Sequence, residues 1–153
     1  ASRMTARTRR INPDIAGEDV ATMLLDHGNG ITSIVDVSYA TKLPQEPFPE
    51  TFVEIDGSKG TLRLGKDYKL IVHGPDGTTE AVVAPNLLPW ASRPWHNIQE
   101  SVALIQKHWI ERLVTGHEPD TSGHDNLKTF ALVEAAYLSA ERGETIALGD
   151  LLG

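Results

Sequence analysis

Three side chains that could recognise a sugar lie close together just before a predicted helix. Trp90, Trp95 and His96 combine two large aromatic rings with an imidazole that can donate or accept a hydrogen bond. Small-molecule pockets often join aromatic walls to a few polar groups, and an indole presents an apolar face beside a polar edge. The alternative is that the tryptophans anchor a surface loop to the core. The anchoring role is favoured, and the sugar-stacking role stays open.

Histidines and carboxylates also gather between the two predicted helices. His117 and His124 flank Glu118, Asp120 and Asp125. A metal site needs ligands that converge on one point and are held by further hydrogen bonds, and this spacing matches no standard zinc pattern. The chain has no cysteine, which excludes thiolate ligands and disulfides. We therefore expect exposed loop histidines and helix-end charges here, and no metal.

Two glycine motifs resemble phosphate-binding loops. Gly28-x-Gly30-x-x-Ser33 nearly matches the dinucleotide fingerprint, and the segment from Gly60 to Lys66 nearly matches a P-loop. Both loops need a helix directly after the glycines, because the amides of its first turn hold the phosphates. Here alternating apolar and polar residues follow, which is typical of strands. The sequence predicts a hairpin turn at the first motif, a strand at the second and no nucleotide site in this chain.

The charge of the chain argues against nucleic-acid binding. The net charge of its 153 residues is -7, whereas phosphate binding needs a basic surface. Arg3, Arg7, Arg9 and Arg10 form one basic cluster. Charged side chains on the solvent face of an edge strand block pairing with other sheets, and we favour this role over binding of an anion or nucleic acid.

Composition also bears on where the protein acts. No apolar run approaches the length of about 18 residues that a transmembrane helix requires, and no signal peptide is visible. Together with the lack of cysteine, this predicts a cytoplasmic protein. The sequence starts with Ala1 instead of an initiator Met, which suggests a processed chain or a fragment.

The hydrophobic pattern predicts strands first and helices last. Helices are expected at 98–114 and 124–142, and proline-rich loops at 42–50 and 85–94. Asn97 with Glu100, and Ser122 with Asp125, suit capping boxes, while Gly116 and Gly143 can end the helices. Strands are expected at 2–11, 19–26, 31–41, 51–56, 61–64, 68–73, 78–83 and 146–148.

This order predicts an α+β fold, with residues 1–153 forming a single domain. The expected architecture is an open, mostly antiparallel β-sheet with two C-terminal helices packed on one face. Strand 31–41 carries apolar residues on both sides, and two helices can cover only one face of the sheet. The other face must meet a partner, and a second copy of the chain is the simplest candidate.

Several segments together resemble a known family. The segment Val53–Leu64, with its Gly-Ser-Lys-Gly turn, resembles the central hairpin of the C-terminal domain of the glucose–fructose oxidoreductase, inositol dehydrogenase and rhizopine-catabolism (Gfo/Idh/MocA) family. Residues 17–21 resemble the start of that domain's second strand. Its closing helices are similar to Trp109–Pro119, Gly123–Asp125, Leu132–Tyr137, Ser139–Ala140 and Gly143–Leu148.

The resemblance implies the substrate-facing and oligomerisation domain of an oxidoreductase that transfers hydride between NAD or NADP and sugars, polyols or related compounds. The family's catalytic Lys belongs to a Glu-Lys-Pro motif in a preceding nucleotide-binding domain, and its Asp and His precede this domain's first strand. Neither motif occurs here, so no catalytic or cofactor-binding residue can be assigned. By analogy, Trp95, His96 and Gln99 are placed near the substrate cleft.

We therefore expect this chain to be inactive alone, with its missing nucleotide-binding domain and a further copy of itself as partners. The alternative is a free-standing dimeric interaction or carbohydrate-binding module without redox activity.

Overall fold

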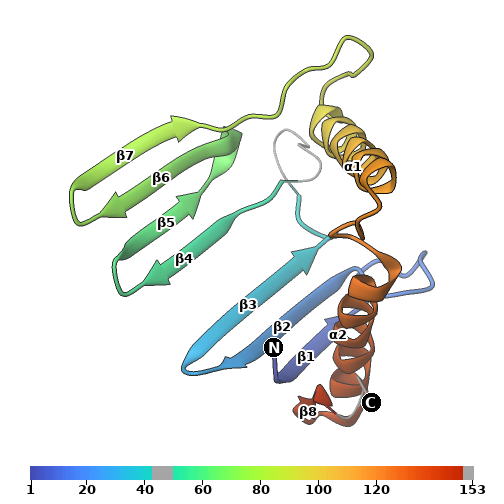
Figure 1. The fold of residues 1–153 in the computed structure, drawn as a ribbon. Coiled ribbons are helices and arrows are strands. Elements are labelled where there is room, and N and C mark those ends of the chain that lie inside the picture. Colours follow the sequence, from blue (N-terminus) through green and yellow to red (C-terminus); the bar gives the residue numbers. More distant parts are fainter. Residues whose placement is uncertain (43–49, 150–153) are drawn as a thin grey trace. The chain divides into compact units, whose positions relative to one another are not determined.

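A computed structural model describes residues 1–42 and 50–149. The chain divides into two compact units, residues 1–42 with 118–153 and residues 43–117. Figure 1 shows the order of the elements along the chain. The proline-rich loop predicted at 42–50 lies mostly outside the described residues. No helix in the described part is long and apolar enough to cross a membrane.

The first unit contains a four-stranded antiparallel sheet in the order β3-β2-β1-β8. Met4 lies opposite Leu25 and Ala6 opposite Met23, so apolar side chains of β1 and β2 share one face. The period of two along each strand separates this face from the one that carries the arginines. The strand bounds are Arg3–Arg9 for β1, Val20–Gly28 for β2, Ile31–Ser38 for β3 and Ile146–Ala147 for β8.

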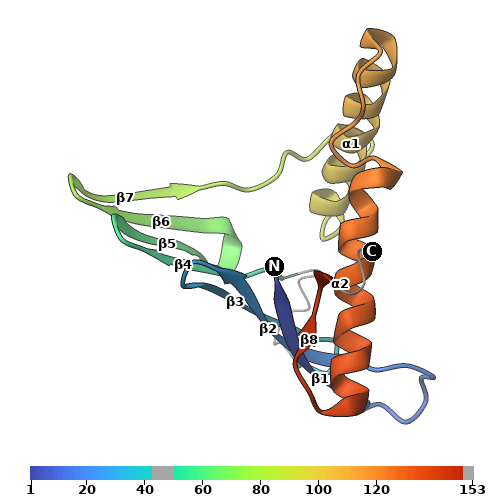
Figure 2. The ribbon, with the colours of Figure 1, turned by 60° about the horizontal axis from the view of Figure 1, so that its bottom comes forward.

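Helix α2, Gly123–Arg142, packs on this apolar face, alongside β1 and β8 (Figure 2). Burial of these side chains supplies the main stabilisation of the unit, at about 25 cal/mol for each Å² of apolar surface removed from water. The core residues are Met4, Ala6, Leu25, Ala135, Ala136 and Leu148, with Met23, Leu132 and Ile146 packed against them.

The second unit contains a separate four-stranded antiparallel meander in the order β4-β5-β6-β7, and helix α1. One face of this sheet carries two ion pairs across neighbouring strands, Arg63–Glu54 at 2.6 Å and Lys69–Glu80 at 2.7 Å. The bounds are Val53–Gly57 for β4, Gly60–Leu64 for β5, Lys69–Gly74 for β6, Gly77–Val82 for β7, Lys66–Tyr68 for the 3-10 turn η1 and His96–Thr115 for α1. The opposite face carries Val53, Ile55, Leu62, Leu64, Leu70 and Val72.

The predicted α+β class is confirmed, with antiparallel strands and two helices toward the C-terminal end. The strands form two sheets and not the one open sheet that we expected. Local patterns give strand positions, whereas the partners of a strand depend on residues far away in sequence, which explains the difference. Strand β1 is also not an edge strand, because β8 pairs with it at Arg3 and Met4.

The helix ends agree with the sequence at three of four places. Ser122 caps α2 by accepting a hydrogen bond from the Asp125 amide, and Gly116 and Gly143 end the helices with φ of 70° and 73°. The fourth prediction was wrong: α1 starts at His96, and the Asn97–Glu100 capping box does not form. Its N-cap is Trp95, whose side chain makes no capping hydrogen bond.

Candidate functional site

The loop before helix α1 is held to the first turns of that helix by two side-chain hydrogen bonds. Asn86 Nδ2 donates to Glu100 Oε1 at 2.6 Å, and the Ser92 amide donates to Gln99 Oε1 at 2.9 Å. All four residues belong to the second unit. The polar side chains of α1 therefore fix the shape of the segment that carries Trp90. The carbonyl oxygen of Gln99 accepts one of these hydrogen bonds.

His96 is buried at the start of α1, with 4% of its surface exposed. Its Nδ1 lies 3.2 Å from the Pro94 carbonyl oxygen. A carbonyl can only accept, so Nδ1 carries a hydrogen, and in the neutral ring Nε2 then carries a lone pair. Nε2 is shielded from solvent and has no hydrogen-bond partner among the described residues. Buried polar atoms are rarely left in this state, which makes His96 the most unusual polar residue of the described structure.

Tyr68 lies edge-on to the His96 ring, with the ring centroids 6.2 Å apart and the planes at 80°. Sequence analysis missed this residue. Asp67 and Tyr68 both adopt positive φ, 57° and 59°, in the region that favours glycine or asparagine. Aspartate tolerates this conformation, whereas a bulky tyrosine is an outlier there, and no local sequence signal predicts it.

The two tryptophans are not buried anchors. Trp90 is 62% exposed and Trp95 is 47% exposed. Hydrogen bonds of Asn86 and Gln99 also hold the loop, and the anchoring role of the tryptophans stays a prediction. Both indoles remain accessible as apolar surfaces in the described structure.

The glycine motifs do not form phosphate-binding loops. Gly28 and Gly30, with φ of 78° and 77°, turn the chain from β2 directly into the antiparallel strand β3. Gly60 opens strand β5, which leads into the short turn η1. No helix amides converge after either motif, which confirms the predicted hairpin and strand. Neither glycine motif therefore has the geometry that holds a dinucleotide.

The carboxylates at the start of α2 bind the cap residue and the first turns of that helix. Ser122 Oγ donates to Glu118 Oε1 at 2.5 Å, and Asp125 Oδ1 lies 3.2 Å from Lys128 Nζ. Among residues 1–42 and 50–149, no three His, Asp or Glu side chains come together as metal ligands. His117 and His124 are exposed on either side of this turn.

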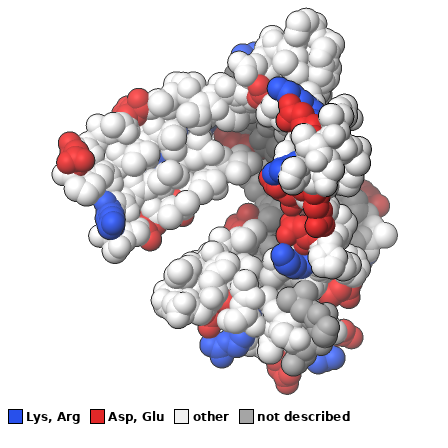
Figure 3. All heavy atoms as spheres, in the orientation of Figure 1, with Lys and Arg blue, Asp and Glu red and all other residues white. Residues whose placement is uncertain are grey.

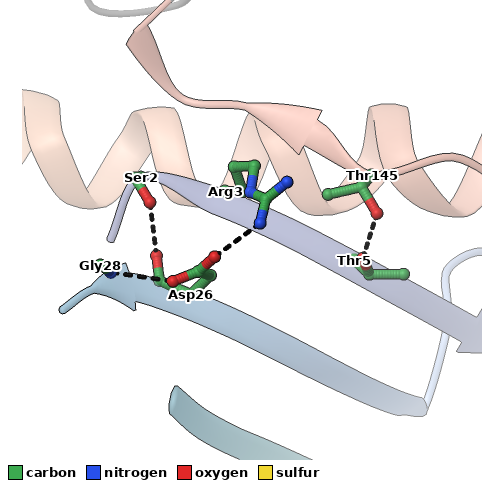
Figure 4. Close-up of polar contacts among 6 residues, drawn as sticks. All are labelled: Ser2, Arg3, Thr5, Asp26, Gly28 and Thr145. Carbon is green, nitrogen blue, oxygen red and sulfur yellow. Dashed lines mark hydrogen bonds and ion pairs between the residues drawn. The ribbon is translucent and has the colours of Figure 1, made fainter. Parts of the chain in front are cut away.

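The arginines of the N-terminal cluster are exposed, as predicted, and Arg3, Arg7 and Arg10 make hydrogen bonds within the first unit. Arg3 Nη2 lies 2.8 Å from Asp26 Oδ2 on the neighbouring strand, and Figure 4 shows the two side chains pointing toward each other. The hydrogen bonds from Arg3 and from the Gly28 amide lower the pKa of Asp26. Arg7 donates to the Ala6 carbonyl and Arg10 to the Ile15 carbonyl. These contacts give the cluster a structural role.

A shallow hollow beside these arginines contains a second polar contact. Tyr137 Oη donates to Glu18 Oε1 at 2.5 Å. This bond lowers the pKa of Glu18 and raises the pKa of Tyr137, so the carboxylate stays ionised and the phenol stays protonated at neutral pH. Neither group is poised to exchange a proton, and the contact ties the loop before β2 to helix α2. The hollow is lined by Thr8, Arg9, Arg10, Ala16, Gly17, Glu18 and Tyr137.

Comparison with known proteins assigns the fold to a family. Residues 1–148 match the group described as the oxidoreductase family, C-terminal alpha/beta domain (GFO_IDH_MocA_C). The chain belongs to the Gfo/Idh/MocA oxidoreductase family, as its C-terminal domain. This match confirms the family resemblance that was inferred from the Val53–Leu64 hairpin and from the closing helices.

Two Gfo/Idh/MocA relatives are similar over nearly the whole chain. A D-apiose dehydrogenase of Rhizobium rhizogenes is 66% identical over 149 residues, 97% of this chain and 43% of that protein. Another of Paraburkholderia graminis is 58% identical over 150 residues, 98% of this chain and 40% of that protein. This chain therefore spans about two fifths of the length of these relatives.

Solved structures of Gfo/Idh/MocA proteins have the same fold as this chain. An oxidoreductase from Agrobacterium radiobacter, in complex with NAD+, L-tartaric acid and magnesium, is 65% identical with a TM-score of 0.95, and the match covers 98% of this chain and 44% of that one. A levoglucosan dehydrogenase, in complex with NADH and levoglucosan, has a TM-score of 0.75 at 14% identity, covering 96% of this chain and 44% of that one, which shows the shared fold alone.

Proposed function

We propose that this chain is the substrate-facing and oligomerisation domain of a cytoplasmic NAD+-dependent dehydrogenase that oxidises an aldose of the D-apiose type. The observation that carries this proposal is the 66% identity to a D-apiose dehydrogenase over 97% of the chain. The solved relative that is 65% identical was crystallised with NAD+, which supports NAD+ over NADP+. In this proposal the hydride acceptor binds outside this chain, because neither glycine motif leads into a helix and the chain spans only 43% of the relative's length.

The loop before α1 is the part of this domain that we propose faces the sugar. Trp95 offers an exposed indole on which a sugar ring can stack, and His96 follows it directly. Gln99 contributes by fixing the loop through the Ser92 amide. The domain alone is inactive in this proposal, because its described residues supply neither a nucleotide site nor a group poised for proton transfer.

Turnover by two matched proteins tests the proposal. The full-length protein, incubated with NAD+ and D-apiose, is expected to produce NADH, followed by absorbance. Residues 1–153 alone are expected to produce none under the same conditions. Failure of the full-length protein to oxidise D-apiose or any related aldose would refute the activity. Turnover by residues 1–153 alone would refute the assignment of the redox site to the missing part.

Oligomerisation is proposed through the apolar face of the β4–β7 sheet. In the view of Figure 3 the middle of this sheet is nearly free of charge, with charged side chains toward its edges. Ile55 is 56% exposed and Val53 is 37% exposed on the apolar face, whereas the opposite face carries the two ion pairs. Contiguous apolar surface of this kind is typical of subunit interfaces. A monomer in light scattering at micromolar concentration would contradict this role.

The exposure of Trp90 and Trp95 favours one alternative, a carbohydrate-binding module without redox activity. Tryptophan fluorescence during titration with sugars distinguishes the two. A response in a full-length protein that has no activity with any aldose supports the module, and a flat response counts against it.

A further inference from the structure

The imidazole of His96 combines three properties that ordinary core histidines do not share. It is almost completely buried, its Nδ1 is occupied by the Pro94 carbonyl, and its Nε2 has no hydrogen-bond partner. A buried polar atom without a partner destabilises the fold, and such atoms in natural proteins call for a functional explanation or a bound group. The unpartnered Nε2 of His96 therefore indicates a binding role for this side chain.

The hydrogen bond to Pro94 determines what this atom can bind. With the hydrogen on Nδ1, Nε2 accepts hydrogen bonds and donates none. A carboxylate or phosphate group offers only acceptors, so it does not complement this atom. His96 also belongs to no group of three metal-ligating side chains in the described part of the chain. The complementary group is a hydrogen-bond donor, and a hydroxyl is the donor that a sugar supplies.

The neighbouring Tyr68 is held beside this ring by a strained backbone. Asp67 and Tyr68 have φ of 57° and 59°, and the Tyr68 carbonyl accepts a hydrogen bond from the Val83 amide at 3.0 Å. Two consecutive non-glycine residues in this conformation persist only when the surrounding structure maintains them, and strain of this kind is concentrated at ligand sites. The placement of the Tyr68 ring against His96 is thus a second, independent indication of a site.

We propose that Nε2 of His96 accepts a hydrogen bond from one hydroxyl of the sugar substrate, making His96 a specificity-determining binding residue. The assignment deepens the function proposed above and rests on it. Nε2 is shielded from solvent in this structure, and Tyr68 lies edge-on to the same ring. The adjacent Trp95 supplies the exposed aromatic surface for the sugar ring.

Steady-state kinetics of the full-length protein test the assignment. His96→Asn keeps a donor near the position of Nδ1 and removes the acceptor at Nε2. We expect the KM for the sugar to rise about tenfold, the cost of one hydrogen bond, with the KM for NAD+ unchanged. His96→Gln places an oxygen near the position of Nε2 and is expected to recover part of the loss. An unchanged sugar KM in His96→Asn overturns the assignment.

His73→Asn provides the matched control, because it makes the same chemical change at an exposed histidine of the same unit. His73 Nδ1 bonds Thr78 Oγ1 at 2.8 Å in the β6–β7 hairpin. We expect both KM values of this variant to stay at the wild-type level. An equal rise in the sugar KM for His96→Asn and His73→Asn would also overturn the proposal. The rise would then follow from replacing any histidine of this unit and not from loss of the His96 acceptor.

A second measurement needs no substitution and remains informative if a variant fails to fold. In wild-type protein labelled with 15N-histidine, addition of sugar is expected to shift the Nε2 resonance of His96 and leave that of His73 in place. An unmoved His96 resonance at a saturating sugar concentration means that an internal water alone occupies the atom, and it overturns the assignment. Absence of any sugar oxidation by the wild type refutes the proposed activity instead, so the two failures are distinguishable.

Discussion

The hydroxyl of Ser139 accepts a hydrogen bond from the backbone amide of Ala6 at 2.8 Å, joining residues 133 positions apart. The same hydroxyl donates to the Glu144 carbonyl at 2.5 Å. Ser139 is completely buried in helix α2, and Ala6 lies in the adjacent strand β1. One side chain therefore attaches the helix both to the sheet and to the turn that follows the helix.

Ser139→Ala is expected to destabilise the first unit by about 1–3 kcal/mol, because it leaves the buried Ala6 amide without a partner. Urea denaturation of the full-length protein, followed by circular dichroism, measures the loss. Ser101→Ala is the control, since its exposed hydroxyl bonds only the Ile98 carbonyl of its own helix. Equal free energies of unfolding for wild type and Ser139→Ala would show that the amide finds another partner.

Gly60→Ala is expected to distort or destabilise the β4–β5 hairpin by about 2–4 kcal/mol, within the range of severe steric mutations. A Cβ at this position would lie 2.1 Å from the His73 carbonyl oxygen, so the backbone itself must shift. Gly74→Ala is the matched control, because the nearest atom to its Cβ lies 3.9 Å away. The thermal midpoints of both variants check this, and a similar midpoint for the two would contradict the steric argument.

Asp19 gives the first unit a pH-dependent stability. Its carboxylate accepts the Ile11 and Asn12 amides at 2.7 and 2.8 Å, and these bonds lower its pKa from the ordinary value of 3.8. A depressed pKa in the folded state stabilises the fold above the unfolded value, and the contribution disappears as the pH falls through the folded value. Asp19→Ala should therefore lower the thermal midpoint at pH 7, and this difference should shrink below about pH 3.8.

Asp14→Ala is the control for this experiment, since Asp14 is an exposed carboxylate of the same loop. Its midpoint should follow the wild type at both pH values. If the difference in thermal midpoint between wild type and Asp19→Ala stays constant down to pH 2, the charge of the Asp19 carboxylate does not contribute to stability.

Gln99→Ala should loosen the loop that carries Trp90, because the Ser92 amide loses its acceptor. Faster chymotrypsin cleavage after Trp90 in the full-length protein is the expected result, identified by mass spectrometry of the fragments. Gln106→Ala changes an exposed glutamine further along the same helix and should leave the rate unaltered. Identical cleavage rates for wild type and Gln99→Ala would mean that the Asn86–Glu100 hydrogen bond holds the loop alone.

Ile55→Glu should weaken subunit association if the apolar face of the β4–β7 sheet forms the interface, because a carboxylate would be buried without a partner. Light scattering of the full-length protein should show a shift toward smaller species. Thr78→Glu places the same charge on the opposite face and should leave the mass unchanged. The reverse pattern would assign the interface to the face that carries the ion pairs.

Features determined by neighbouring residues could be predicted from the sequence. The Gly28-Asn29-Gly30 turn, the Ser122 cap and the left-handed Gly116 and Gly143 all arise from local backbone preferences. The strand expected at 2–11 likewise corresponds to β1, in which Met4 and Ala6 alternate with more exposed residues. These signals were sufficient for the element order and the α+β class.

Features that depend on distant residues could not be predicted. Separation of the strands into two sheets depends on pairings across the chain, such as that of Met4 with Ile146. The start of α1 at His96 depends on the fold around the buried ring, which overrides the capping potential of Asn97. Tyr68 has no local preference for its conformation. The substrate-facing roles of Trp95, His96 and Gln99 stay predictions.

The short strand β8 brings distant parts of the first unit together. Arg3 lies opposite Ala147, and the Leu148 amide donates to the Ser2 carbonyl at 2.9 Å. The second hydrogen-bonding edge of β1 is therefore paired with residues more than 140 positions further along the chain. Removal of β8 would leave the backbone N–H and C=O groups at the start of β1 unpaired, and such a bare edge is a site where other chains can add a strand.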